Sequence, residues 1–112
     1  ETVLAEKLET VISRGVVNTR PRDFYDIHML WILHGGDCRI ETLRKALDAT
    51  CGKRGSSKRM ALWDRVLGEV KEDGQMLALW GKYTRKNPYA AEISLAECCE
   101  TTREIMLSIS ER

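Results

Sequence analysis

The apolar stretch over residues 18–33 constrains the fold of this chain more than any other segment. It begins like a helix, because Asn18 or Thr19 can serve as a cap and Pro21 fits a first turn, where its missing N–H needs no partner. Asp23 follows, where the helix dipole favours a negative charge, and apolar residues then lie on nearly every side. This pattern predicts a buried central helix.

Two carboxylates share one face of this predicted helix. Asp23 and Asp26 are three residues apart, and Leu30 and Leu33 continue the same face. Burying a carboxylate is costly unless a cation or a hydrogen-bond donor pairs with it. We therefore expect a partner for these aspartates, and the nature of that partner bears on function.

A lysine on the preceding helix is a candidate for that partner. Residues 2–14 show helical periodicity and end at Gly15. The apolar arc of this helix consists of Val3, Leu4, Leu8, Val11 and Ile12. Lys7 falls inside the arc. Either its stem packs on the apolar surface while its amine reaches water, or it points into a cleft where it meets an anion.

Two arginines, Arg20 and Arg22, precede the first aspartate of the central helix. In one interpretation they form a local ion pair with Asp23, which contributes about 0–1 kcal/mol if it is exposed. In the other, they bind phosphate while the aspartates orient Lys7 or a metal ion. The pattern alone is compatible with either.

The rest of the chain shows helical patterns and no convincing strand. Helices are predicted over 40–51, 58–72 and 95–110, with one more between a capping Asp73 and the helix-breaking Asn87–Pro88. Ser94 and Glu97 have the spacing of a capping box at the start of the last helix. The 112 residues are therefore predicted to form one all-α domain, a compact bundle of about six helices around the central helix near 20–34.

A basic segment over 52–59 separates two of these helices, and its glycines and serines predict a flexible loop. Its cations are Lys53, Arg54, Lys58 and Arg59. These side chains either remain solvated or contact a polyanion such as RNA. The segment lacks the order of a phosphate-binding P-loop, and it has no interleaved aromatic residue for base stacking. Residues 1–65 carry a net charge of +3 and residues 66–112 of −2, which weakly favours an anionic partner for the first half.

The cysteines and histidines do not form a recognisable metal site. The four cysteines are Cys38, Cys51, Cys98 and Cys99. No pair has CxxC spacing, and neither His28 nor His34 is placed to complete a zinc site. We therefore predict free thiols in a reducing, cytoplasmic compartment, and no metal bound by this chain. His28 lies opposite Asp26 on the helix, which is typical of a core or surface histidine, and no apolar run is long enough to cross a membrane.

Two short motifs resemble those of a known family. Leu4–Leu8 reads Leu-Ala-Glu-Lys-Leu, and Arg20–Asp26 reads Arg-Pro-Arg-Asp-Phe-Tyr-Asp. In this order they resemble the A-E-K-L and R-x-[KR]-D-x-x-D motifs of the AbiEii/AbiGii-type nucleotidyltransferase toxins, which act in abortive infection, a phage defence. Cys51–Gly55 and Asn87–Tyr89 are also similar to that family, so the resemblance covers nearly the whole chain.

The resemblance implies that residues 1–112 are the helical C-terminal portion of a larger nucleotidyltransferase. In that family an N-terminal α/β domain of the polymerase-β type carries a G-S motif and a D-x-D strand, and this chain contains neither. The full-length enzyme would use Mg²⁺ and a nucleoside triphosphate, with the metal ligands in the missing domain. The isolated chain is then expected to be inactive.

The resemblance also implies a role for each motif residue. Lys7, with Arg20 and Arg22, would contact the nucleotide phosphates, because phosphoryl transfer needs cations there and an acceptor held in line. Asp23 and Asp26 would be catalytic, and Asp23 would either orient Lys7 or accept a proton from the acceptor hydroxyl. The implied partners are an RNA acceptor such as tRNA and a DNA-binding antitoxin, and the face left exposed by the missing domain could pair with a second copy of the chain.

A different function class fits the same composition. A non-catalytic helical module could hold RNA through the four cations of residues 52–59, or bind a protein. Such an RNA-binding module would bind with a steep salt dependence and would be insensitive to changes at Lys7 or Asp23.

Overall fold

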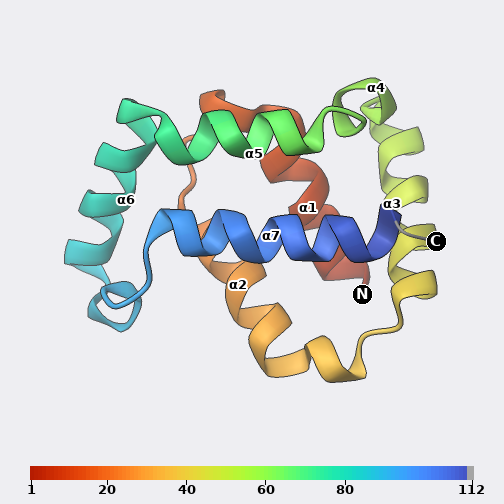
Figure 1. Ribbon diagram of the computed structural model, residues 1–112, viewed down its shortest axis with the longest axis horizontal. Coiled ribbons are helices and arrows are strands. Elements are labelled where there is room, and N and C mark those ends of the chain that lie inside the picture. The colour runs from red at the N-terminus through yellow and green to blue at the C-terminus, as the bar shows by residue number, and fades with distance from the viewer. Residues whose placement is uncertain (111–112) are drawn as a thin grey trace.

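The computed structural model describes residues 1–110, and within them the chain is all-α, as the sequence predicts. Seven α-helices and three short 3₁₀ helices make up the described fold, which contains no strand (Figure 1). In chain order these elements are α1 (Thr2–Arg14), η1 (Gly15–Val17), α2 (Arg22–His34), η2 (Gly35–Asp37), α3 (Ile40–Arg54), α4 (Ser57–Met60), α5 (Trp63–Glu72), α6 (Gly74–Lys86), η3 (Pro88–Ala90) and α7 (Leu95–Ser110).

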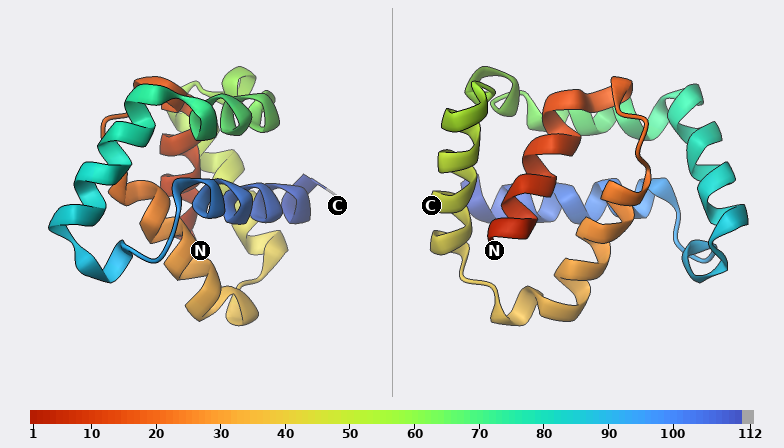
Figure 2. Two further views of the ribbon diagram at one scale, coloured as in Figure 1. Left: turned by 60° about the vertical axis from the view of Figure 1, so that its left-hand side comes forward. Right: turned by 180° about the vertical axis from the view of Figure 1, so that it is seen from behind.

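Helix α7 is the element on which the fold is arranged. Figure 1 shows it crossing the molecule beside α5, with α3 at one end and α6 at the other. It packs mainly on α2 and α5, whereas α1 packs mainly on α3 and α2. The view from behind shows α1 between α3 and α2 (Figure 2). The side chains with no exposed surface include Leu8, Val11, Ile12, Phe24, Ile27, Leu43, Val70 and Ile105.

The prediction of a central helix buried on all sides is wrong for the second half of α2. Phe24 and Ile27, near its start, are fully buried, but Ile32 and Leu33 are 59% and 64% exposed. The reason is tertiary: α2 packs on α7 and α1, and its last turns extend past α7 (Figure 1). The face that carries the aspartates therefore does not continue into the core at Leu33.

Most of the predicted helix ends are confirmed. Gly15 follows α1, as predicted, with φ of +52°, a backbone conformation that glycine adopts without strain. Helix α3 is an exception: it runs past its predicted end at residue 51 and is followed by Gly55, which has φ of +67°. The Asp73 side chain accepts a hydrogen bond from the Met76 N–H at 2.9 Å. Ser94 and Glu97 form the predicted capping box.

The start of α2 differs from the prediction. Neither Asn18 nor Thr19 caps the helix, and no side chain of the described residues does so. The buried Asn18 side chain instead accepts a hydrogen bond from the Arg20 N–H at 3.0 Å, which fixes the bend just before Pro21. Asn18 does accept a hydrogen bond from the backbone, as a capping residue would, but it stabilises the turn before α2 rather than the first turn of the helix.

The predicted loop over 52–59 and the predicted helix over 58–72 both need correction. Helix α3 continues to Arg54, so much of the basic segment is helical rather than a flexible loop. A short helix, α4, follows and is separate from α5. Helix α4 packs on α1 and α3, whereas α5 packs on α7, so the chain changes direction between them. Tertiary packing therefore overrides a periodicity that would allow one continuous helix.

His28 and the cysteines are structural. The His28 ring is buried, and its Nδ1 lies 2.8 Å from the Thr101 hydroxyl, which links α2 to α7. The predicted core or surface histidine is therefore a core histidine. The four cysteines are free, as predicted. No helix of the described chain is long and apolar enough to span a bilayer.

Because the two halves of α2 are unevenly buried, substitutions in them should lower the free energy of unfolding by different amounts. Replacing the fully buried Phe24 by alanine should lower the free energy of unfolding by about 3–5 kcal/mol, because it leaves a cavity in the core. The matched variant Ile32→Ala, on the same helix but exposed, should change it by less than about 0.5 kcal/mol. Urea unfolding of the two variants measures the difference, and equal losses would contradict the observed packing of α2.

The adjacent thiols of α7 predict a loss of stability at alkaline pH. Burial raises the pKa of Cys98 and of Cys99 from 9.0 to about 12. The unfolded chain therefore loses these protons at a lower pH than the folded chain. Above pH 9 stability should fall, by about 1.4 kcal/mol per pH unit for each thiol, until the folded thiols also ionise. Urea unfolding in reducing buffer at pH 8 and pH 10 should show a smaller fall in a Cys98→Ala/Cys99→Ala variant than in the parent.

Candidate site at the junction of α1 and α2

Lys7 of α1 lies between the two aspartates of α2. Its Nζ is 3.0 Å from Oδ2 of Asp26 and 3.8 Å from Oδ1 of Asp23. The lysine side chain keeps only a quarter of its surface exposed. Of the two interpretations of Lys7, the structure favours the one in which the amine meets an anion, and the predicted partner of the aspartates is this lysine.

The two arginines before α2 extend the same group of charges. Nε of Arg20 is 3.9 Å from Oδ2 of Asp23, and Nε of Arg22 is 3.6 Å from Oδ2 of Asp26. Both arginine side chains are mostly exposed, so they form the local ion pairs and also remain accessible from solvent. We call Lys7, Arg20, Arg22, Asp23 and Asp26 the ion-pair cluster. Its three cations and two carboxylates leave a net charge of +1.

The carboxylate of Asp23 is buried but is only loosely paired. Its side chain is 6% exposed, and its two nearest cations lie at 3.8 and 3.9 Å, beyond hydrogen-bonding distance. By contrast, Asp26 accepts a hydrogen bond from Lys7 at 3.0 Å. The Asp23 carboxylate therefore retains unused capacity to accept a hydrogen bond, which is unusual for a buried charged group.

An open polar cavity of about 420 Å³ lies over one side of the ion-pair cluster. It is lined by Val3, Glu6, Lys7, Glu9, Thr10, Arg14, Arg20, Asp23 and Arg54. Four of these side chains are cations and three are carboxylates, so the lining suits a polar, charged ligand better than an apolar one.

Arg54, predicted as part of a nucleic-acid contact, forms a wall of this cavity. It donates hydrogen bonds to the buried Glu9 carboxylate at 3.2 Å and to the Thr10 hydroxyl at 3.3 Å. These contacts tie α3 to α1. Arg54 is also exposed, as are Lys53, Lys58 and Arg59, and the proposed contact of these four cations with RNA stays a prediction.

The chain was compared with known protein families. The sequence model of one family, described as "Nucleotidyl transferase AbiEii toxin, Type IV TA system", matches residues 1–100. The chain belongs to this family. The match includes both motifs that form the ion-pair cluster, and it confirms the resemblance seen in the sequence. Comparison with curated proteins and with solved structures found no match.

The ion-pair cluster of this AbiEii chain does not fit a magnesium ion. Mg²⁺ binds to carboxylate and water oxygens, but here the Lys7 ammonium occupies the space between the two aspartates. Within residues 1–110, moreover, no three His, Cys, Asp or Glu side chains gather in a way that could hold a metal. The cations of the cluster fit phosphate groups instead.

A tyrosine cluster borders the ion-pair cluster and was missed by the sequence analysis. The ring centroids of Tyr25 and Tyr89 are 5.2 Å apart, and the hydroxyls of Tyr83 and Tyr89 are 3.0 Å apart. Burial, the hydrogen bond with Tyr89 and the charge of Asp26 all raise the pKa of Tyr83. The signal was present in residues 82–89, where three basic residues and two tyrosines lie close together around the end of the predicted helix.

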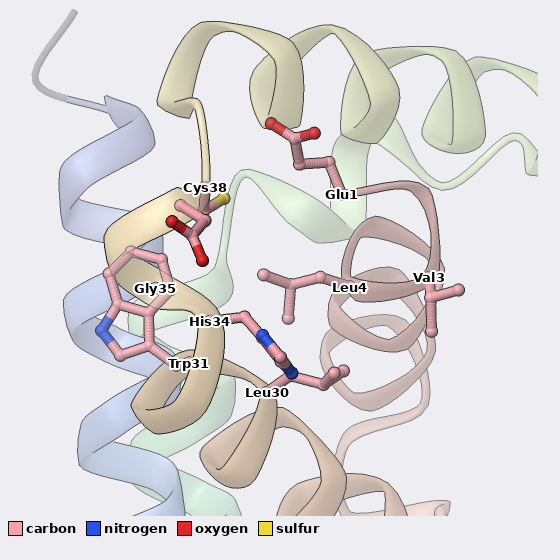
Figure 3. Close-up of a pocket in the computed structure, with 9 residues that line it drawn as sticks. Glu1, Val3, Leu4, Leu30, Trp31, His34, Gly35 and Cys38 are labelled. Carbon is pink, nitrogen blue, oxygen red and sulfur yellow. The ribbon is translucent and has the colours of Figure 1, made fainter.

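A second cavity, of about 210 Å³, lies between the start of α1 and the end of α2. Figure 3 shows Leu4 and Val3 on one side and Leu30, Trp31 and His34 on the other. Its lining is mainly apolar, and it adjoins the exposed last turns of α2. No residue of the ion-pair cluster lines it.

The contact between Lys7 and Asp26 predicts a measurable coupling energy. In a double-mutant cycle with Lys7→Met and Asp26→Asn, the two residues should couple by about 1 kcal/mol, because both are largely buried. The same cycle on the exposed pair Arg65 and Glu69, which are 3.7 Å apart, should give less than about 0.5 kcal/mol. Equal coupling in the two cycles, measured by urea unfolding, would mean that the Lys7 contact is only a surface ion pair.

Proposed function

We propose that this chain supplies the nucleotide-phosphate-binding and acceptor-positioning half of a nucleotidyltransferase active site. The observation that carries the proposal is the position of Lys7 between Asp26 and the buried Asp23, which joins both family motifs in one place. A separate α/β domain would carry the metal ions and complete the site.

Lys7 suits contact with the triphosphate because its amine is already held in place. Stabilising charge on a transferring phosphoryl group depends on cations positioned before the reaction begins. Asp26 fixes the amine at 3.0 Å, and the exposed Arg20 and Arg22 add two further cations at the rim. The net charge of +1 favours an anionic ligand without preventing release of the product.

The two aspartates have different environments, and we assign them different roles. Asp26 is the closer carboxylate and orients Lys7. Asp23 is the looser partner, and it can accept the hydrogen bond, and then the proton, of an acceptor hydroxyl. The hydroxyl oxygen forms a bond to the α-phosphorus of the nucleoside triphosphate while the bond from that phosphorus to pyrophosphate breaks and pyrophosphate leaves. The acceptor in this proposal is RNA, and a DNA-binding antitoxin and a second copy of the chain are the proposed protein partners.

The test is an activity assay on the full-length protein that contains this chain. Lys7→Ala should raise KM for the nucleoside triphosphate, and Asp23→Asn should lower kcat at least 100-fold, a loss typical of a missing general base. The matched control is Lys45→Ala, an exposed lysine of α3 that lines neither the polar nor the apolar cavity. It should retain full activity.

Two outcomes would contradict the proposal. Full transfer activity in both Lys7→Ala and Asp23→Asn would show that the ion-pair cluster is purely structural. Magnesium-dependent labelling of RNA by residues 1–112 alone would show that no second domain is needed. If these variants leave activity unchanged but loss of Lys53, Arg54, Lys58 and Arg59 abolishes RNA binding, the chain is a non-catalytic RNA-binding module.

A further inference from the structure

The surface formed by the tyrosine cluster and the end of α6 combines aromatic rings with cations. Figure 1 shows α6 and η3 together at one end of the molecule. We infer that the tyrosine cluster, with Lys82, Lys86 and Arg22, binds single-stranded RNA. This inference rests on the proposed function, because it gives the RNA acceptor a binding surface beside the ion-pair cluster.

Tyr89 is exposed but is held in place. Its side chain is 59% exposed, yet its hydroxyl is 3.0 Å from that of Tyr83 and its ring lies 5.2 Å from that of Tyr25. Because these contacts already hold the ring in place, it loses little conformational freedom when a base stacks on its exposed face. Stacking on such rings is the main way in which proteins bind unpaired bases.

Two exposed lysines of α6 lie near Tyr83 on the helix surface. Lys82 and Lys86 are four residues apart and exposed, so they lie on one side of α6 beside Tyr83. Arg85 is two residues after Tyr83, which places it roughly 160° around the helix. The two lysines can therefore follow a phosphate backbone along the tyrosines, whereas Arg85 cannot.

Helix α2 connects this surface to the ion-pair cluster. At about 100° per residue, Arg22 lies between Tyr25 and Asp26 around the helix. Tyr25 directly precedes Asp26 on α2, and its ring centroid lies 6.2 Å from that of Tyr83, so the two clusters are close in space. A strand with a base on Tyr89 would place phosphate near Arg22, which lies beside Asp26 of the ion-pair cluster.

The exposed ring favours a single strand over a duplex. Bases in a duplex are stacked on each other and paired, so their faces cannot reach an aromatic side chain. The basic residues of 53–59, in contrast, have no aromatic neighbour in the sequence to distinguish the two forms.

The experiment measures binding of a fluorescein-labelled 12-nucleotide single-stranded RNA to residues 1–112 by anisotropy. Tyr89→Ala should weaken binding about 5- to 100-fold without changing the salt slope, while Tyr89→Phe should retain most of the affinity. Lys82→Ala/Lys86→Ala should weaken binding and reduce the slope of log K against log salt by about 1.4. The matched control Arg85→Ala should leave affinity nearly unchanged.

Several results would overturn the inference. These are equal binding of a 12-base-pair duplex RNA, wild-type affinity in Tyr89→Ala, and an effect of Arg85→Ala as large as that of the double lysine variant. Weakened binding of ATP but not of RNA in Tyr89→Ala would assign the tyrosines to the base of the incoming nucleotide instead, and would also overturn it.

The two proposals fail in distinguishable ways. If Tyr89→Ala binds RNA normally while Lys7→Ala impairs nucleotide transfer in the full-length protein, only the RNA surface is wrong. If Tyr89→Ala loses RNA binding while Lys7→Ala and Asp23→Asn transfer normally, only the proposed function is wrong. Circular dichroism should show unchanged helix content in Tyr89→Ala, because most of that side chain is exposed.

Discussion

The contact of Lys7 with Asp26 and Asp23 is the interaction on which the candidate site depends. It joins α1 to α2 at the point where both helices carry their family motif. Without Lys7, the carboxylates of Asp23 and Asp26 would lie on the same face of α2 with no amine between them, and the Asp23 side chain is nearly buried. The pairing thus makes the burial of Asp23 tolerable, and at the same time it fixes an amine at the wall of an open polar cavity.

The first turns of α2 contribute both to the core and to the candidate site. Phe24 and Ile27 bury one side of the helix in the core, which fixes the rotation of the helix. With that rotation set, the aspartates face Lys7 and Tyr25 faces Tyr89. Core packing therefore determines the geometry of the charged and aromatic side chains of the candidate site.

Much of this arrangement could be predicted from residue patterns. The partner of the aspartates was visible as a lysine inside an apolar arc, and the motifs pointed to the AbiEii family. The pairing of Arg54 with Glu9 could not be predicted, because the two residues are distant in sequence and the pattern placed Arg54 in a flexible loop rather than at the end of α3. The tyrosine cluster was missed for a related reason: Tyr83 fits a core stripe, and its proximity to Tyr89 and Tyr25 appears only when three elements meet.

The sequence by itself determined the all-α class, most helix ends and the family, since caps, breakers and motifs act over a few neighbouring residues. Tertiary structure alone decided which apolar residues are buried, because burial depends on the elements that cover a helix. It left Ile32 and Leu33 exposed, and it separated α4 from α5. It also decided that Lys7 lies closer to Asp26 than to Asp23, since that choice depends on how α1 packs against α2.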